Sequence, residues 1–513
     1  MAVPSGKHSV TASSPTEAIK GDHQSLLMIM TGLGDKPASG RLLRGLTPYL
    51  DEQGAEHVIL LTERRRREPW SASEEVVLYQ EVVHWARNAD GGVYRGTAWK
   101  GHTLSREEIL PAFELDPLGV VDWAARRAQA AVVSTAEPMP LSPCIVPKPW
   151  GREIWYTGIE ARGRAGVRTQ TGESELPYAL GMFPVPTIGE DEKPPVLLKA
   201  LDPLPQAVIG DLYLEVHNEK WEVYVVMDVD RTAWADGIGR LRAGLAPEIV
   251  RRYRAKMPSG WEAQIGKDLT AAIKSYEDVR RRIDMLNDQT LQSLGADPKQ
   301  GTPSEHRAAV AAAIPSALQK EEVQRRAAVE SFLGHMDMPV GAVACLRPGV
   351  LHSLQHGVKV IEFQTPTYER LIAMFAQKVL TQPHWDVDAA VARMEKDTFT
   401  QPPLDVLQRT ETSLLERVVT FPEFTVTRLT LQPGAAHETA TAGNGAYQLL
   451  VGVKGGGAVR SPDGRSWALK SDLAYLIPAT LGRFSITATG SEPLVLLVTT
   501  PTHTPLATAK AKR

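Results

Sequence analysis

Two carboxylates and an imidazole alternate with apolar residues in the stretch LYLEVHNEKWEVYVVMDVD, residues 212–230. The alternation predicts a strand, a short polar turn and a second strand. Residues two apart on a strand share a face, so Glu215 and His217 should point the same way. If a four-residue turn covers 218–221, His217 faces Glu222 across a hairpin, with Cβ atoms about 4.5–5.5 Å apart. We therefore expect three potential metal ligands to converge.

A fourth potential ligand follows the turn in RPGVLHSL, residues 347–354, where His352 begins the next expected strand. Four nitrogen and oxygen ligands, two of them histidines, suit Zn²⁺ and, less selectively, other divalent ions. Alternating Glu and His residues are also typical of the solvated face of an antiparallel sheet. The residues alone leave both interpretations open.

Six short sequence words occur in one order along the chain: KPWG (148–151), LLKALD (197–202), EVH (215–217), KWEVYVV (220–226), PGVLHSL (348–354) and VIEFQTPTYER (360–370). Their order and wording resemble the type I mannose-6-phosphate isomerases. That family is zinc-dependent and has two cupin barrels, with a helical domain inserted between strands. The resemblance covers roughly residues 144–505, and residues 1–140 lie outside it.

The resemblance implies a single Zn²⁺ ion, with other divalent ions as alternatives. In the family, a Gln-x-His pair, a Glu that begins the next strand and a His after a Pro/Gly turn hold the metal. The matching positions here are Glu215, His217, Glu222 and His352. This chain departs from the family by having Glu215 in place of Gln, Asn218 in place of Pro and Tyr213 in place of Ser. A second carboxylate would weaken the power of the ion to polarise oxygen.

The resemblance also implies a substrate site. Lys199 and Lys220 match lysines that help to hold the phosphate of the sugar. Glu362 matches an active-site glutamate, and Arg370 matches, with one residue of slippage, an arginine near the reacting carbons. The implied activity is the aldose–ketose interconversion of mannose 6-phosphate and fructose 6-phosphate. Such a reaction needs a proton shuttle and stabilisation of an oxyanion, which a carboxylate and a cation provide.

Two other functions stay open. One is a catalytically silent sugar-phosphate-binding or regulatory cupin, and the other is a cupin oxygenase that uses Fe(II), because mixed His and carboxylate ligands also suit that ion. Glu362 and Arg370 favour the isomerase, since a binding protein needs no proton shuttle. Tyr213 and Glu215 favour the alternatives.

The fold that we expect is mainly β, with two cupin (jelly-roll) barrels, an inserted helical domain and a small preceding α/β domain. The expected limits are 1–24 disordered, 25–140 α/β domain, 141–235 with 335–400 first cupin, 236–334 helical insertion, 401–505 degenerate second cupin and 506–513 tail. Apolar residues recur every three or four positions in the insertion, and short strands punctuated by turns fill the second cupin. His437 and Glu438 there form no His-x-His pair.

Within the α/β domain, SLLMIM and HVILL read as strands that flank a Gly-rich loop over 31–40 and a helix over 41–54. Further helices are expected over 71–88 and 118–133. The glycines of the loop match no phosphate-binding spacing, so the loop predicts a structural turn.

The composition restricts the possible partners. A formal net charge of −3 gives no electrostatic reason to expect nucleic acid or an anionic membrane. No apolar run approaches the roughly 20 residues of a membrane helix, and residues 1–24 contain no segment typical of a secretory signal. Two cysteines, Cys144 and Cys345, fit a reducing compartment. We expect a cytoplasmic protein that binds a small-molecule sugar phosphate; no feature predicts its oligomeric state.

Overall fold

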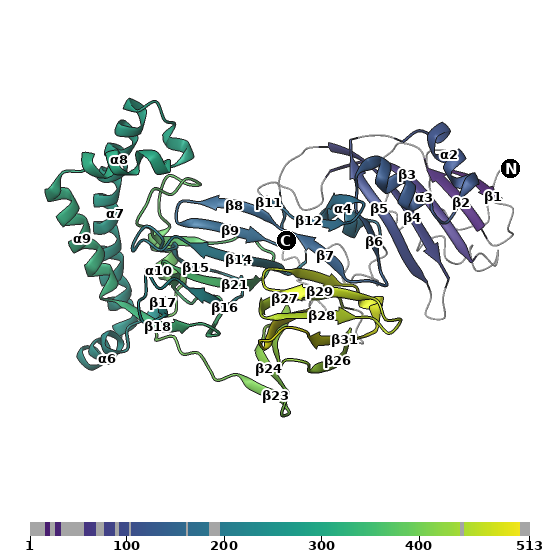
Figure 1. Cartoon of the computed structure of the whole chain (residues 1–513). Helices are drawn as coiled ribbons and strands as arrows, with labels where there is room; N and C mark the ends of the chain where they lie inside the picture. Colours follow the sequence, from purple (N-terminus) through teal and green to yellow (C-terminus); the bar gives the residue numbers. More distant parts are fainter. Residues whose placement is uncertain are drawn as a thin grey trace, which may run out of the picture. The chain divides into compact units, whose positions relative to one another are not determined.

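The computed structural model describes residues 16–20, 26–31, 56–67, 76–87, 92–101, 104–160, 163–183, 195–441 and 446–502. The described chain is mainly β, with several antiparallel sheets (Figure 1). It divides into two compact units. Unit 1 comprises Met1–Cys144, Trp155–Val196 and Leu404–Arg513, and unit 2 comprises Ile145–Ile154 and Leu197–Pro403. The predicted domain limits remain predictions.

A six-stranded sheet forms the N-terminal part of unit 1, in the order β1-β2-β3-β4-β5-β6. Its strands are β1 (Thr16–Lys20), β2 (Leu26–Thr31), β3 (His57–Arg67), β4 (Val76–Ala86), β5 (Val93–Lys100) and β6 (Val132–Ser134). Strands β2 and β3 are parallel, and the other pairs are antiparallel. Helices α2 (Arg106–Leu115) and α3 (Val120–Ala128) share an apolar core with this sheet. A capping box of Ser105 and Glu108 begins α2.

The helix predicted over 71–88 is wrong, because residues 76–86 form β4. This strand lies between β3 and β5, and its residues 79–83 are all buried. A strand buried on both faces loses its alternation and cannot be told from a buried helix by periodicity. The β-branched and aromatic content of VVLYQEVVHW was the signal for a strand.

Other predictions for this region have different outcomes. The strands over SLLMIM and HVILL are confirmed as β2 and β3, and α3 confirms part of the helix over 118–133. Residues 16–20 form β1 within the segment 1–24. The predictions for the loop over 31–40, the helix over 41–54 and the tail over 506–513 lie outside the described residues, apart from Thr31 in β2.

The C-terminal strands of unit 1 form a nine-stranded sheet, ordered β13-β12-β7-β30-β27-β32-β25-β24-β23, and a four-stranded sheet, ordered β26-β31-β28-β29. The first contains β7 (Met139–Ser142), β12 (Gly166–Thr169), β13 (Gly172–Glu175), β23 (Asp405–Arg409), β24 (Ser413–Thr420), β25 (Phe424–Leu431), β27 (Gln448–Lys454), β30 (Ala474–Ile477) and β32 (Leu494–Pro501). The second contains β26 (Ala436–Ala440), β28 (Gly456–Arg460), β29 (Ser466–Lys470) and β31 (Arg483–Ala488). Both sheets contribute to one apolar core.

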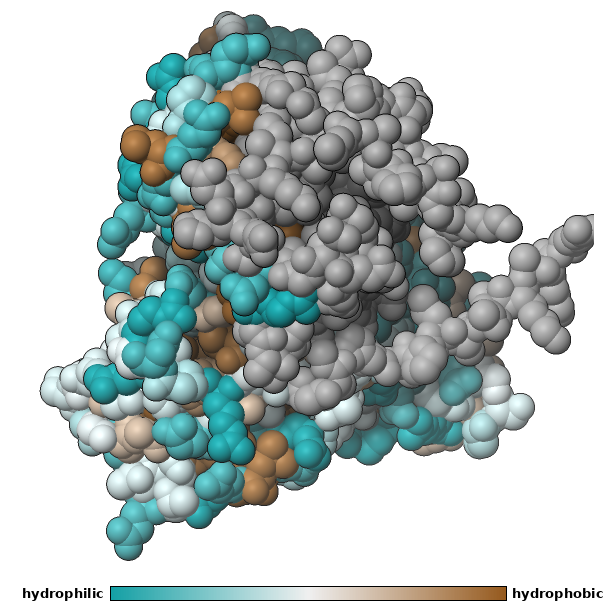
Figure 2. All heavy atoms as spheres, turned by 90° about the vertical axis from the view of Figure 1, so that its right-hand side faces the viewer, coloured by the Kyte–Doolittle hydropathy of each residue, from teal (hydrophilic) through white to brown (hydrophobic). Residues whose placement is uncertain are grey.

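Smaller elements complete unit 1: β10 (Ile159–Glu160), β11 (Gly163–Arg164), α4 (Leu176–Gly181) and the 3₁₀ turn η3 (Ala479–Leu481). In the face shown in Figure 2, hydrophilic and neutral residues make up most of the described surface, with small hydrophobic groups between them. Among the described residues, no helix combines the length and the apolar character needed to cross a membrane.

Unit 2 is built around two sheets. The six-stranded sheet has the order β19-β16-β21-β14-β9-β8, and the five-stranded sheet has the order β18-β17-β20-β15-β22. Their strands are β8 (Cys144–Lys148), β9 (Gly151–Trp155), β14 (Leu197–Pro203), β15 (Leu214–Val216), β16 (Glu222–Val229), β17 (Ile238–Leu245), β18 (Leu333–Pro339), β19 (Val343–Leu346), β20 (His352–Leu354), β21 (Val358–Gln364) and β22 (Leu371–Met374). Side chains from both sheets, including Val216 and Tyr224, meet in one apolar core.

The predicted hairpin over 212–230 is wrong in its pairing, although both of its strands form. Strand β15 pairs with β20 and β22, whereas β16 pairs with β19 and β21. The turn over 217–221 therefore carries the chain from one sheet to the other. Alternation predicts a strand and its faces, but it does not identify the partner strand.

The helices of unit 2 lie mainly between β17 and β18. They are α6 (Pro247–Lys256), α7 (Trp261–Ser293), α8 (Arg307–Ala313) and α9 (Ser316–Glu330), with the 3₁₀ turns η1 (Pro298–Gln300) and η2 (Ser304–His306), and α10 (Val387–Arg393) follows later. Helices α7, α8 and α9 lie together at one end of the strands (Figure 1). Ile265, Leu269, Ile273 and Tyr276, spaced three or four residues apart on α7, join the core of the sheets.

A buried ion network ties this helical region to the five-stranded sheet. Arg242 on β17 donates to Asp211 at 2.7 Å and to Glu330 at the end of α9 at 2.9 Å. It also lies 3.3 Å from the Ser353 hydroxyl on β20. Burial would raise the pKa of Asp211, but hydrogen bonds from His356 and the charge of Arg242 outweigh it and hold this pKa well below its usual range.

We predict that Arg242→Ala lowers the free energy of unfolding of unit 2 by about 3–5 kcal/mol, because it leaves the buried Asp211 and the partly buried Glu330 without their cation. Hydrogen exchange in peptides from β17 and β20, followed by mass spectrometry, would measure the change. Arg254→Ala is the matched control, because Arg254 pairs with Asp397 while half exposed and such pairs contribute little. Equal effects of the two substitutions would contradict the prediction.

Candidate metal centre

The four predicted metal ligands come together in unit 2. Glu215 on β15 is the ladder partner of His352 on β20. Nε2 of His217 lies 3.7 Å from a carboxylate oxygen of Glu215 and 3.5 Å from one of Glu222. Nε2 of His352 lies 3.2 Å from the other oxygen of Glu222. The arrangement draws ligands from both sheets, with Glu222 as the first residue of β16.

The donor atoms at this centre fit a divalent cation. His217 is 2% exposed, yet neither of its ring nitrogens has a hydrogen-bond partner among the described residues, and Oε2 of Glu215 is also buried without one there. Buried polar atoms without partners are costly, and a bound ion removes that cost. Ligand atoms of Glu215, His217 and His352 all lie within 4.8 Å of one another. Two imidazoles with carboxylates suit Zn²⁺ among divalent ions.

The two imidazoles have different surroundings. Nδ1 of His352 lies 2.9 Å from the carbonyl oxygen of Val350. A carbonyl only accepts, so Nδ1 carries the proton and Nε2 faces the centre, as in many histidines that bind metals. Burial, aided by Lys220, lowers the pKa of His217. A lower pKa favours the neutral imidazole that metals bind.

Lys220 lies inside the centre, paired with one of its carboxylates. Its Nζ is 2.6 Å from Oε1 of Glu222, and both side chains are buried. Burial would raise the pKa of Glu222, but Lys220 and His217 outweigh it and hold this pKa well below its usual range. The hydroxyl of Tyr224 donates to the other oxygen of Glu222 at 3.1 Å. Lys220 therefore offsets one of the two negative charges that Glu215 and Glu222 bring.

A second cluster occupies the same sheet as Glu222. Lys199 on β14 and Glu362 on β21 are ladder partners, and their charged atoms are 3.2 Å apart. Lys199 also donates to Gln364 at 2.7 Å and lies 3.7 Å from Glu153 on β9. Glu362 and Gln364 are two residues apart and so share a face. Glu153 and Gln364 follow no spacing that the sequence reveals, because their role depends on which strands are neighbours.

Glu362 differs in its pKa from Glu222, one of the proposed ligand carboxylates. It is 3% exposed, and burial raises its pKa to about 8, with Lys199 acting in the opposite direction. The carboxylates around Lys199 outweigh its burial and raise the pKa of that amine. The backbone of Glu362 pairs with Tyr224 on β16, so this carboxylate lies one strand away from the strand of Glu222.

Arg370 lies in the segment after β21, near Glu215. Its guanidinium carbon is 4.6 Å from the ring centroid of Tyr213, and Nη2 donates to Thr381 at 2.7 Å. Burial would lower the pKa of Arg370, but the charge of Glu215 outweighs it and raises this pKa. The ring of Tyr213 is thus covered by this cation.

Glu369, which sequence analysis passed over, holds the turn between β15 and β16. Its carboxylate accepts hydrogen bonds from the amides of Asn218, Glu219 and Lys220 at 2.5, 3.1 and 3.4 Å. The amide of Gly349, which has a φ of +92°, donates to the carbonyl of His217 at 3.0 Å. These bonds join segments that lie about 150 residues apart, so no local spacing rule identifies Glu369.

We predict that the purified chain retains one zinc ion after desalting and that His217→Ala weakens zinc binding by more than about tenfold, because removing a ligand costs at least as much as removing its supporting partner. Elemental analysis of the protein, with competition by a chelator, would measure this. His384→Ala is the control, because that side chain is 69% exposed and should leave zinc content unchanged. Unchanged zinc content in His217→Ala would contradict the assignment.

We also predict that Glu369→Gln weakens zinc binding by about tenfold, because a neutral amide holds the three turn amides less well and the ligands on either side lose their fixed position. The same chelator competition measures the change. Glu219→Gln alters an exposed residue of the same turn in the same chemical way and should have little effect. Equal zinc affinities for the two variants would show that the turn needs no such support.

Among solved structures, the chain is similar to the mannose 6-phosphate isomerase from Bacillus subtilis, with 14% identity and a TM-score of 0.47 over 71% of this chain and 99% of that chain. It is similar to the apo form of the enzyme from Salmonella typhimurium, with 12% identity and a TM-score of 0.45 over 71% and 99%. A zinc-bound mannose 6-phosphate isomerase matches with 12% identity and a TM-score of 0.45 over 71% and 100%. No protein-family model matches the sequence, and no curated protein sequence matches it significantly.

Proposed function

We propose that the chain is a metal-dependent aldose–ketose isomerase of sugar phosphates, of the type that interconverts mannose 6-phosphate and fructose 6-phosphate. The observation that carries the proposal is Glu362. This buried carboxylate stands apart from the four ligands, one strand from Glu222, and is paired with Lys199. A centre built only to hold a metal needs no such group. The order of the six sequence words supports the same conclusion.

The reaction moves one proton between adjacent carbons. In the aldose-to-ketose direction, Glu362 takes the proton from C2 and returns it to C1, while the hydroxyl proton of O2 passes to O1. A bound divalent ion would supply Lewis acidity toward the oxygens of the substrate. Lys199 stays protonated beside Glu362 and stabilises its ionised form. Arg370 offers positive charge for the oxyanion that develops between the two steps.

The phosphate of the substrate needs cationic partners, and the two that we propose are both buried. Lys199 and Lys220 remain the proposed groups, as ammonium ions that act as point charges. Each already pairs with a buried carboxylate, Glu362 and Glu222 respectively. Phosphate binding would therefore add a contact to an existing ion pair, so we expect modest affinity for the phosphate alone.

A catalytically silent sugar-phosphate-binding protein is the second candidate. Tyr213 favours it, because this residue replaces a serine that contacts phosphate in the family, and Arg370 lies over its ring at 4.6 Å. Both candidate functions include a bound metal ion, but only the isomerase predicts turnover of the sugar phosphate.

A coupled assay for the conversion of mannose 6-phosphate to fructose 6-phosphate tests the proposal on the zinc-loaded chain. We expect turnover, and we expect Glu362→Gln to lower kcat by about 10²–10⁴-fold, because the proton shuttle is lost. Zinc content should not change in this variant. Glu395→Gln alters a partly exposed carboxylate paired with Arg347 and should keep full activity.

Bound zinc without turnover of either hexose phosphate would contradict the proposed isomerase activity. Calorimetric binding of mannose 6-phosphate by that inactive chain would then favour the silent binding protein. Full activity in Glu362→Gln would instead show that another group moves the proton.

A further inference from the structure

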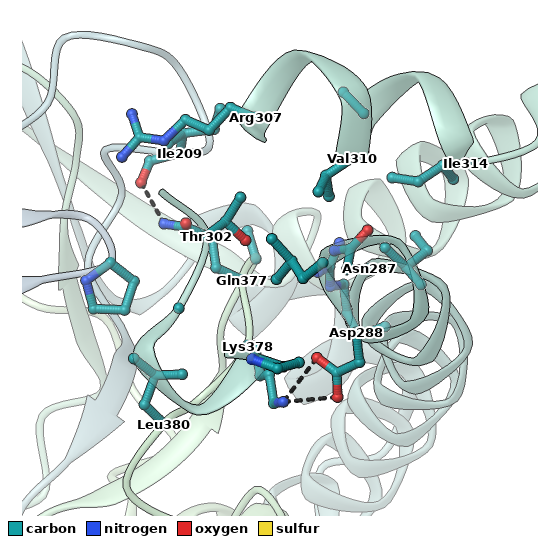
Figure 3. A pocket seen from close by; sticks show the side chains of 18 residues that line it. Ile209, Asn287, Asp288, Thr302, Arg307, Val310, Ile314, Gln377, Lys378 and Leu380 are labelled. Carbon is teal, nitrogen blue, oxygen red and sulfur yellow. Dashed lines mark hydrogen bonds and ion pairs between the residues drawn. The ribbon is translucent and has the colours of Figure 1, made fainter. Parts of the chain in front are cut away.

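A cavity of about 210 Å³ lies in unit 2, between the helical region and the segment that follows β22 (Figure 3). One wall is the face of α7 that carries Arg280, Ile283, Asn287 and Leu291, at helical spacing. Helix α8 and the segment 376–380 form the other walls, and Gln377 is fixed by a hydrogen bond to the carbonyl of Ile209 at 2.7 Å. None of the predicted ligand, catalytic or phosphate-binding residues lines this cavity.

Arg280 and Asn287 bring polar groups to the α7 wall. Arg280 is 7% exposed; its Nη2 donates to Asp284 at 2.9 Å, but its Nε has no hydrogen bond to any described residue. Oδ1 of Asn287, seven residues later on the same face, is likewise buried without a partner among the described residues. Because protein atoms cover both of these atoms, a ligand in the cavity would meet the remaining polar atoms of the two side chains, which are N–H donors.

The charges around the cavity leave one cation uncompensated. Arg280 pairs with Asp284, and Nζ of Lys378 lies 2.8 Å from both carboxylate oxygens of Asp288. Arg307 also lines the cavity; its side chain is exposed, and it makes no ion pair with any residue that the structure describes. The local balance is therefore one positive charge, which matches a monoanion.

Much of the remaining wall is apolar. Ile283, Leu291 and Val310 are buried and line the cavity, and Ile314 stands beside Val310 (Figure 3). The volume lies below the roughly 300–1,000 Å³ of pockets for drug-sized ligands, so the occupant is smaller. Water alone would pair with Asn287, but it would neither balance Arg307 nor cover the apolar side chains.

We propose that this cavity binds a small organic monocarboxylate, whose apolar body packs on Ile283, Leu291 and Val310 and whose carboxylate faces Arg280 and Arg307. A phosphate dianion would overcompensate the single positive charge and leave the apolar wall uncovered. The inference is independent of the proposed isomerase activity, because the cavity and the candidate metal centre share no lining residue.

Fluorine NMR of the full chain with 4-fluorobenzoate or 5,5,5-trifluoropentanoate tests the proposal, with 4-fluorobenzamide and inorganic phosphate as comparison compounds. We expect at least one of the carboxylates to bind, and the neutral amide to bind at least about tenfold more weakly than its acid, because a charged hydrogen bond is lost. Phosphate should not displace the bound carboxylate. Binding should be the same in the presence and absence of zinc.

Three variants locate the binding site. Arg307→Gln should weaken carboxylate binding about threefold to fivefold, as expected for a partly exposed ion pair. Ala311→Trp places a large side chain at an exposed position of the wall and should abolish binding. Arg282→Gln is the matched control on the same helix, because Arg282 pairs with Glu321 and does not line the cavity.

The proposal fails if neither carboxylate binds at about 10 mM, which would leave a cavity occupied by water only. It fails equally if the amide binds as well as the acid, or if Ala311→Trp binds as the unsubstituted chain does. Thermal unfolding of each variant, which should match that of the unsubstituted chain, separates loss of binding from loss of folding.

Discussion

Residues 217–221 carry the chain from the five-stranded sheet to the six-stranded sheet, and the carboxylate of Glu369 binds three of their amides. Glu215 and His217 lie on one side of this turn and Glu222 on the other. Their separation is therefore set by the distance between the two sheets and by the conformation of five residues. In a hairpin within one sheet, the hydrogen bonds between the two strands would have fixed this separation. Glu369, the amide of Gly349 and the guanidinium of Arg393 all bind this turn, and the separation of the proposed metal ligands depends on them.

The ionised side chains near this turn form pairs of opposite charge. Glu222 pairs with Lys220, and Glu362 pairs with Lys199, so each buried carboxylate of the six-stranded sheet has an ammonium partner. The charge of Glu215 raises the pKa of Arg370, in the loop after β21, and the pKa of Lys220. Two cations therefore offset this third carboxylate.

The sequence predicted the convergence of the four ligands for a reason that was partly mistaken. Period-two alternation identified the strands and the shared face of Glu215 and His217, and the turn before His352 was recognisable from Pro348 and Gly349. The pairing of β15 with β16 was wrong, because alternation carries no information about partner strands. Glu153, Gln364 and Glu369 went unnoticed for the same reason.

Burial on both faces explains the other main error. Strand β4 is central in its sheet, and its apolar residues run without alternation, so VVLYQEVVHW matched a helix as well as a strand. The long helix of unit 2 was easier to predict, since α7 exposes one face and buries the other. An amphipathic helix has a distinct period in sequence, whereas a fully buried segment such as β4 fits more than one type of element.

Helix α7 has 33 residues and is therefore about 50 Å long at 1.5 Å per residue. Its first half, through Tyr276, is packed into the core of the sheets, while Arg280 to Leu291 form the wall of the cavity. The first half of the helix is thus fixed by the sheets, whereas the second half packs against α8, α9 and the segment that contains Lys378. The position of the cavity wall therefore depends on packing on both sides of the helix. The residues of the second half that line the cavity lie outside the apolar core beneath the proposed metal ligands, so the two regions can vary independently of each other.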